Sequence, residues 1–180
     1  IASHCIIQLA AAGYKVKATV RDLSRTNKLN QTLLNGLEKH EGKSDLSVDW
    51  QVTNLSSDEG WDEAMAGCDY VLHVASPIAM QLPKDEDEMV KPAVEGTLRV
   101  LKAASKAGVK RVVVTSSVAA IMYGTDKEGI FNEEDWTDPK SKTTNVYAKS
   151  KTLAEKAAWE FIEKDNSGIC LLYTSDAADE

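Results

Sequence analysis

The chain has 180 residues, of which 43% are hydrophobic and 27% are charged, proportions typical of a globular domain with a core of its own. It carries 28 acidic and 21 basic residues, a formal net charge of -7, without a long lysine- or arginine-rich tract, so we do not expect nucleic acid as a partner. No apolar run approaches the roughly 20 residues of a membrane span and no secretory pattern is visible, so we expect a cytoplasmic protein without a membrane partner.

Strand-like and helix-like segments alternate along the chain, which predicts an α/β fold with a parallel sheet covered by helices. In chain order we expect a helix at 1–10, a strand at 14–20, a helix at 24–38, a strand at 48–52, a short helix carrying Trp61 and capped by Ser57 or Asp58, a strand at 69–75, a helix from the acidic run 85–88 to 107, a strand at 109–115 and a helix at 145–164. The strand at 69–75 is almost continuously apolar, which predicts that both of its faces are buried.

The cysteines and the acidic run do not predict a metal site. Cys5, Cys68 and Cys170 are far apart and form no C-x-x-C pattern, so neither a zinc site nor a disulfide framework is expected. Residues 85–88 have the wrong spacing for a calcium loop and are expected to begin a helix. His73 lies inside an apolar strand, where a packed core histidine is the expected role.

Both ends of the sequence suggest a piece of a longer protein. The chain opens without methionine inside a helical pattern, and residues 170–180, CLLYTSDAADE, look like one reading frame of a common sequencing adapter. We therefore expect the native sequence to end near residue 169. The apolar run at 169–173 nevertheless has the pattern of a buried strand.

The most informative motif is Tyr147-Ala-Lys-Ser-Lys151, within the last predicted helix. Side chains four residues apart share one helix face, so the Lys151 ammonium can stabilise the phenolate and lower the pKa of Tyr147 from about 10. A phenol with a lowered pKa can protonate a carbonyl oxygen. The same pair also occurs on exposed helix surfaces, so the interpretation depends on its neighbours.

Ser117 supplies the neighbouring group. Ser116 and Ser117 directly follow the strand at 109–115, at the sheet edge where ligands of open α/β folds bind. A hydroxyl there can hold a substrate carbonyl, although a serine in this place can also simply cap a turn. Together, Ser117, Tyr147 and Lys151 indicate an enzyme that transfers hydride to a carbonyl.

Five motifs resemble the extended short-chain dehydrogenases/reductases, most closely the branch of dihydroflavonol reductases, cinnamoyl-CoA reductases and microbial aldehyde or ketone reductases. They are TVRD at 19–22, GCDYVLHVASP at 67–77, PAVEGT at 92–97, KRVVVTSS at 110–117 and YAKSKTLAEKAAW at 147–159. The resemblance implies a Rossmann-type doubly wound parallel sheet that lacks its first strand and the C-terminal substrate-binding part. Residues 1–169 would be a partial NAD(P)-binding domain, and residues 170–180 a non-native tail derived from the adapter.

The resemblance also implies roles for individual residues. Tyr147 would be the general acid, Lys151 would lower the tyrosine pKa and bind the nicotinamide ribose, and Ser117 would orient the carbonyl oxygen. Arg21 and Lys28 would hold the 2'-phosphate of NADP, because a guanidinium suits a phosphate whereas NAD-preferring relatives place an acid at that strand end. We therefore expect NADPH as cofactor, although Asp22 directly follows the arginine.

Two further segments are expected to contact the same cofactor. Val74, Ala75 and Ser76 would run beneath its adenosine and pyrophosphate through backbone contacts. Asn54 and Leu55 would lie against the adenine, where the branch usually has Asp-Leu; this departure keeps an oxygen acceptor but loses its charge.

The predicted function of the full-length protein is that of an NADPH-dependent reductase, whose small-molecule carbonyl substrate is an aldehyde or a ketone. We expect this fragment alone to be inactive. One alternative is a nucleotide-sugar epimerase or dehydratase with tightly held NAD, which uses the same serine, tyrosine and lysine. Another is a non-catalytic dinucleotide-sensing regulator. Arg21 favours the reductase over the epimerase, and the presence of both Tyr147 and Lys151 disfavours the regulator.

Overall fold

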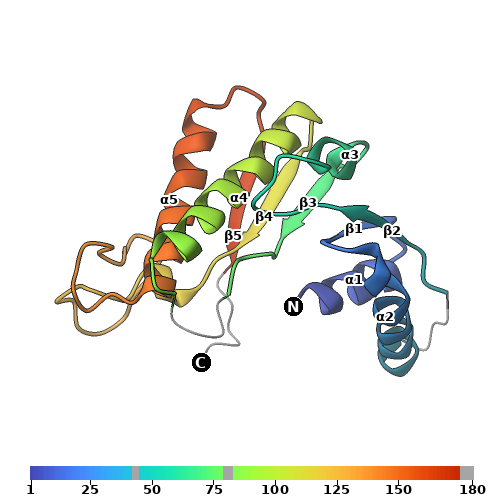
Figure 1. Ribbon diagram of the computed structural model, residues 1–180, viewed down its shortest axis with the longest axis horizontal. Helices are drawn as coiled ribbons and strands as arrows, with labels where there is room; N and C mark the ends of the chain where they lie inside the picture. The colour runs from blue at the N-terminus through green and yellow to red at the C-terminus, as the bar shows by residue number, and fades with distance from the viewer. Residues whose placement is uncertain (42–44, 79–82, 175–180) are drawn as a thin grey trace.

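The computed structural model describes residues 1–41, 45–78 and 83–174. Its elements are α1 (Ala2–Ala11), β1 (Val16–Val20), the 3-10 turn η1 (Leu23–Arg25), α2 (Thr26–Glu41), β2 (Val48–Val52), α3 (Trp61–Met65), β3 (Tyr70–His73), α4 (Asp87–Lys106), β4 (Arg111–Thr115), the 3-10 turn η2 (Val118–Ala120), α5 (Val146–Lys164) and β5 (Cys170–Thr174) (Figure 1). The predicted alternation of strands and helices is confirmed. Every pair of described strands is parallel, as expected for a Rossmann-type α/β fold.

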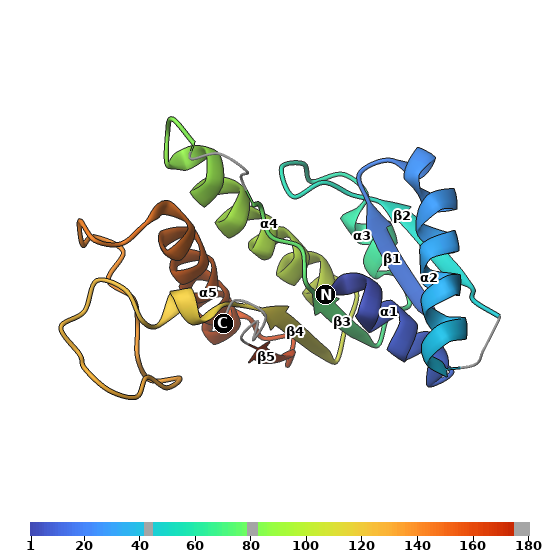
Figure 2. The ribbon, with the colours of Figure 1, turned by 90° about the horizontal axis from the view of Figure 1, so that it is seen from below.

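The described strands form two sheets. One contains β1 and β2, and the other has the order β3-β4-β5. Among the described residues no strand pairs with the second edge of β1 or with the outer edge of β3. Figures 1 and 2 show α1 and α2 beside the smaller sheet and α4 and α5 beside the larger one, which occupies the middle of the molecule.

The larger sheet has a well-developed core on one face. Helices α4 and α5 lie side by side across it (Figure 2). Leu101 of α4, Val112 of β4 and Ala158 of α5 are completely buried there. The helix-facing side chains of the strands alternate with outward-facing ones, which is the geometry expected of a strand against a helical layer.

The smaller sheet has a smaller hydrophobic core than the larger one. Its core consists of Ile7 from α1 with Leu33 and Leu37 from α2, packed against partly buried side chains of β2. On the opposite face the Lys17 ammonium donates hydrogen bonds to the backbone carbonyls of Glu63 in α3 and of Ala66, which caps its C-terminus. Helices therefore lie on both sides of β1 and β2.

The exposure of β3 corrects one expectation. Tyr70 and Leu72 are 58% and 43% exposed, so the prediction that both faces of this strand are buried is wrong. The reason is that α4 and α5 cover only the other face, toward which Val71 and His73 point. Leu172 on β5 shares the uncovered face and is 45% exposed.

The predicted capping of α3 is also wrong. The cap residue is Gly60, in the left-handed conformation with φ 78°, and no side chain caps the helix. A Cβ at this glycine would lie 2.1 Å from the Val52 carbonyl oxygen, so the tight approach to β2 requires glycine. Ser57 instead accepts a hydrogen bond from the Glu59 amide, and Asp58 pairs with Arg99 at 2.5 Å.

Candidate active site

Helix α5 positions two of the predicted catalytic residues. Its N-terminus is capped by Asn145, whose side-chain oxygen accepts a hydrogen bond of 2.8 Å from the Ala148 amide. Tyr147 and Lys151 follow within the first two turns, so their side chains lie on one helix face. The Lys151 Nζ atom is 5.9 Å from the centroid of the Tyr147 ring. The structure thus brings the phenol and the ammonium together.

The same lysine reaches the end of β4. Lys151 is only 8% exposed, and its ammonium donates a 3.4 Å hydrogen bond to the carbonyl oxygen of Thr115. Because Thr115 is the last residue of β4, this contact joins Lys151, the partner of the candidate acid, to the carboxyl edge of the sheet. That edge is where the sequence predicted the site.

Ser117 lies directly beyond this contact, buried and packed near α5. It caps the η2 turn, because its hydroxyl oxygen accepts a 3.2 Å hydrogen bond from the Ala119 amide. The capping interpretation of this serine therefore describes a real contact. A hydroxyl has one donor proton and two acceptor lone pairs, so capping is chemically compatible with a donated hydrogen bond to a substrate oxygen.

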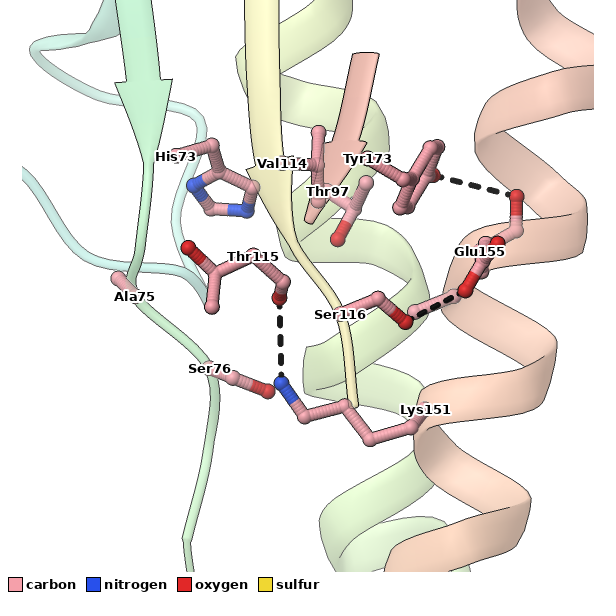
Figure 3. Close-up of a pocket in the computed structure, with 11 residues that line it drawn as sticks. His73, Ala75, Ser76, Thr97, Val114, Thr115, Ser116, Lys151, Glu155 and Tyr173 are labelled. Atoms are coloured by element: carbon pink, nitrogen blue, oxygen red, sulfur yellow. Dashed lines mark hydrogen bonds between the residues drawn. The ribbon is translucent and has the colours of Figure 1, made fainter. Parts of the chain in front are cut away.

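A small cavity opens beside Lys151, between the ends of β3 and β4 and helix α5 (Figure 3). Its wall includes Ala75 and Ser76 after β3, Thr115 and Ser116 at the end of β4, and Lys151 and Glu155 from α5. Figure 3 shows the Lys151 ammonium reaching from the helix toward the chain that follows β3. Two of the predicted cofactor-contacting residues, Ala75 and Ser76, thus share a cavity with Lys151.

Burial controls the charges around this cavity. Burial, together with the nearby Lys151 charge, lowers the pKa of His73 to about 4, so this histidine is neutral near pH 7. Burial raises the pKa of Glu155, against the opposing effects of the Ser116 hydroxyl, the Trp159 indole and the Lys151 charge. The position of His73, only 6% exposed, agrees with the packed role predicted for it.

One pair in the cavity wall was missed from the sequence. The Ser116 hydroxyl donates a 2.5 Å hydrogen bond to the Glu155 carboxylate, and the Tyr173 hydroxyl donates to the Glu155 backbone carbonyl at 3.2 Å (Figure 3). A signal for Glu155 was available, because it stands four residues after Lys151 as Lys151 stands four after Tyr147. Its partner could not be read from that spacing.

The predicted phosphate-binding residues lie elsewhere, at the end of β1. Arg21 directly follows this strand and is exposed, and Lys28 is exposed in the first turns of α2. Figure 1 shows β1 on the other side of the molecule from α5, the helix that carries Tyr147 and Lys151. The intervening Asp22 caps η1, since its carboxylate accepts hydrogen bonds from the Ser24 amide and hydroxyl at 2.8 and 2.6 Å, which lower its pKa.

The predicted adenine contacts are held against α4. Asn54 bonds locally, accepting a hydrogen bond from the Ser56 amide, while the carbonyl of Leu55 accepts one of 2.9 Å from Arg99. A Cβ on Gly96 would lie 2.8 Å from a methyl carbon of Leu55, so this glycine permits the close approach of the loop. Val74 is half-buried just after β3.

Comparison with known proteins places this architecture in a family. The NAD dependent epimerase/dehydratase family matches residues 1–177. The chain belongs to this family.

Its relatives include plant reductases. Dihydroflavonol 4-reductase of Arabidopsis thaliana is 38% identical over 170 residues, with 91% of this chain and 43% of the relative covered. Anthocyanidin reductase of the same plant is 37% identical over 179 residues, with 94% and 50% covered. The chain spans about half the length of these curated relatives.

A solved structure shows the same fold. Yeast methylglyoxal/isovaleraldehyde reductase Gre2, complexed with NADPH, superposes with a TM-score of 0.77 at 29% identity, with 97% of this chain and 53% of that protein covered. This agreement confirms the Rossmann-type fold predicted from the sequence.

The described part of the chain contains neither a cluster of metal ligands nor a membrane-spanning helix. Within residues 1–41, 45–78 and 83–174, no three histidine, cysteine, aspartate or glutamate side chains gather as metal ligands. None of the helices in these ranges combines the length and apolar character needed to cross a membrane.

Proposed function

We propose that this chain is the cofactor-binding part of an NADPH-dependent reductase that converts an aldehyde or ketone into an alcohol. The observation that carries this proposal is the position of Lys151. Its ammonium lies 5.9 Å from the Tyr147 ring centroid and 3.4 Å from the last carbonyl of β4, where a substrate of an α/β fold would bind. The similarity to reductases over most of the chain supports the same conclusion.

In the proposed reaction the tyrosine is the proton donor. The Tyr147 hydroxyl gives its proton to the substrate carbonyl oxygen, and the Lys151 ammonium stabilises the phenolate that remains. The Ser117 hydroxyl holds the same carbonyl oxygen and fixes its orientation. NADPH, when bound, supplies the hydride that the carbonyl carbon accepts, so one hydride and one proton together produce the alcohol.

The residues at the end of β1 suit a phosphorylated cofactor. Arg21 is exposed and presents a planar set of donors that can hold a phosphate at two points. Asp22, which could have argued for NAD, uses its carboxylate oxygens in the η1 cap. Lys28 adds a second positive charge on the adjoining helix. This chemistry supports NADP over NAD.

The test uses the intact protein that contains this chain, with NADPH and a series of aldehydes and ketones. We expect carbonyl-dependent loss of NADPH absorbance, and we expect Tyr147→Phe to lower kcat by about 10²- to 10⁴-fold. Arg21→Ala should raise KM for NADPH about tenfold or more and leave KM for NADH nearly unchanged, because only NADPH carries the phosphate.

The same experiment separates the other functions. An epimerase or dehydratase would convert its substrate without net consumption of NADPH. A dinucleotide-sensing regulator would bind NADPH, turn over no carbonyl and be unaffected by Tyr147→Phe. Either result would overturn the proposed reductase.

A further inference from the structure

Glu155 holds the end of β4 to helix α5 through a contact that the proposed reaction does not itself use. Its carboxylate accepts the 2.5 Å hydrogen bond from Ser116, a residue 39 positions earlier in the chain. The backbone of Glu155 is held in turn by the Tyr173 hydroxyl of β5. Glu155 therefore links two strands to the helix that carries Tyr147 and Lys151 (Figure 3).

Side chains from two successive turns of α5 form hydrogen bonds with two successive residues, Thr115 and Ser116. Lys151 donates to the Thr115 carbonyl, and one turn later Glu155 accepts from the Ser116 hydroxyl. The next residue is Ser117, which begins the η2 turn. A chain held at two consecutive residues has little freedom at the third, because only two soft backbone dihedrals per residue separate them.

A carboxylate is well suited to this contact. Ser116 is buried, so a partner that could not accept its proton would leave a polar group unsatisfied away from water. An ionised acceptor also makes a stronger and shorter bond than a neutral one. Burial raises the pKa of Glu155, and the Ser116 hydroxyl and the Lys151 charge partly oppose that rise.

We propose that Glu155 is a positioning residue, which through Ser116 fixes the turn that carries Ser117 and so sets where the serine hydroxyl meets the carbonyl oxygen beside Tyr147. This inference rests on the proposed reductase function. It assigns Glu155 no contact with the substrate or the cofactor. The expected defect of its loss is therefore a misplaced Ser117 with NADPH binding largely intact.

The experiment compares variants of the intact reductase. Glu155→Ala should lower kcat about 10- to 100-fold, as misplacement of a reacting group does, while KM for NADPH changes less than about threefold. Glu155→Gln keeps an acceptor oxygen of the same length and should recover most of kcat. Glu163→Ala, an exposed glutamate on the same helix, is the matched control and should have no effect.

Ser116→Ala completes the test, because it deletes the same hydrogen bond from the other side. It should lower kcat in the parent but cause little further loss in Glu155→Ala, since both changes break one contact. If Glu155→Ala does not fold, Ser116→Ala and Glu155→Gln decide the question alone. A parent-like kcat in Ser116→Ala, or equal and additive losses in the double variant, would overturn the positioning role.

Tyr147→Phe distinguishes a failure of the positioning role from a failure of the proposed reductase function. If Tyr147→Phe abolishes turnover while Glu155→Ala and Ser116→Ala leave kcat unchanged, the reductase stands and the positioning role is wrong. If Tyr147→Phe leaves turnover intact, the proposed chemistry itself is wrong.

Discussion

The two sheets differ in the size of the hydrophobic core that each shares with its helices. Among the described residues, the sheet β3-β4-β5 shares a core of twelve buried side chains with α3, α4 and α5. The sheet of β1 and β2 shares a core of only three, from α1 and α2. Hydrophobic stabilisation grows with the apolar area removed from water, so the larger unit should account for most of the folding free energy.

The two parts of the proposed site lie on different units. Tyr147, Lys151 and Ser117 are positioned by the larger unit, whereas Arg21 and Lys28 are carried by the smaller one. The catalytic geometry should therefore persist when the smaller unit opens. Binding of the 2'-phosphate of a cofactor should be lost when the smaller unit opens, before the catalytic geometry is lost. Regions that open at low free energy commonly include ligand-binding segments.

Removal of one leucine from each core tests whether the two units unfold separately. Leu101→Ala should lower the free energy of unfolding by about 2–5 kcal/mol and expose the amides of β3, β4 and β5 to exchange. Leu37→Ala, also at a completely buried position, should expose only the amides of the smaller unit. Hydrogen–deuterium exchange read by mass spectrometry distinguishes them. Loss of protection in β4 on Leu37→Ala would show that the two units unfold together.

A pair of neighbouring leucines tests whether β5 belongs to the larger unit. Leu171 faces the core and Leu172 faces solvent, so Leu171→Ala should cost about 2–3 kcal/mol and Leu172→Ala less than about 1 kcal/mol. Urea denaturation followed by tryptophan fluorescence gives both values. Equal, negligible costs would mean that residues 170–174 add nothing to the folded sheet. The adapter origin of residues 170–180 stays a prediction.

The stability of the larger unit should also depend on pH through His73. Its folded pKa of about 4 lies below the unfolded value of 6.5, so the unfolded chain binds the proton more readily as the pH falls. The contribution is complete above about pH 6.5 and should decline by roughly 2 kcal/mol by about pH 5.

Urea denaturation at pH 7 and pH 5 checks this expectation. The loss between the two pH values should be clearly smaller in His73→Gln than in the parent chain. His4→Gln, at an exposed position in α1, is the matched control and should behave as the parent does. An identical pH dependence in all three proteins would rule out the role of His73.

The smallest effect concerns the caps of the two units. Asn145→Ala removes the cap of α5 and should lower the free energy of unfolding by about 1 kcal/mol. Asp22→Ala removes the cap of the short η1 turn and should have a smaller effect, because the hydrogen bonds of that cap are exposed to water. Thermal melts measure both. A larger loss on Asp22→Ala would reverse the proposed ranking of the two units.

Much of this architecture was predictable from local patterns. The strand at Val48–Val52 was predicted with its observed bounds, and the helix predicted at 145–164 begins one residue later, at Val146. Periods of 2 and 3.6 residues are local properties, so strands, helices and the shared face of Tyr147 and Lys151 can be read directly. The same holds for the position of Ser117, since it is the second residue after a recognisable strand.

Other features depended on which elements meet in space. The apolar run at 69–75 could not reveal that Leu72 is exposed, because burial depends on which face α4 and α5 cover. Nor could it reveal the split into two sheets, which is a matter of pairing between distant strands. The partners of Glu155 and Leu55, 39 and 44 residues away, likewise follow only from packing. Sequence alone determined the elements and the chemistry they carry, while tertiary structure decided their partners, because long-range contacts leave no periodic trace in the chain.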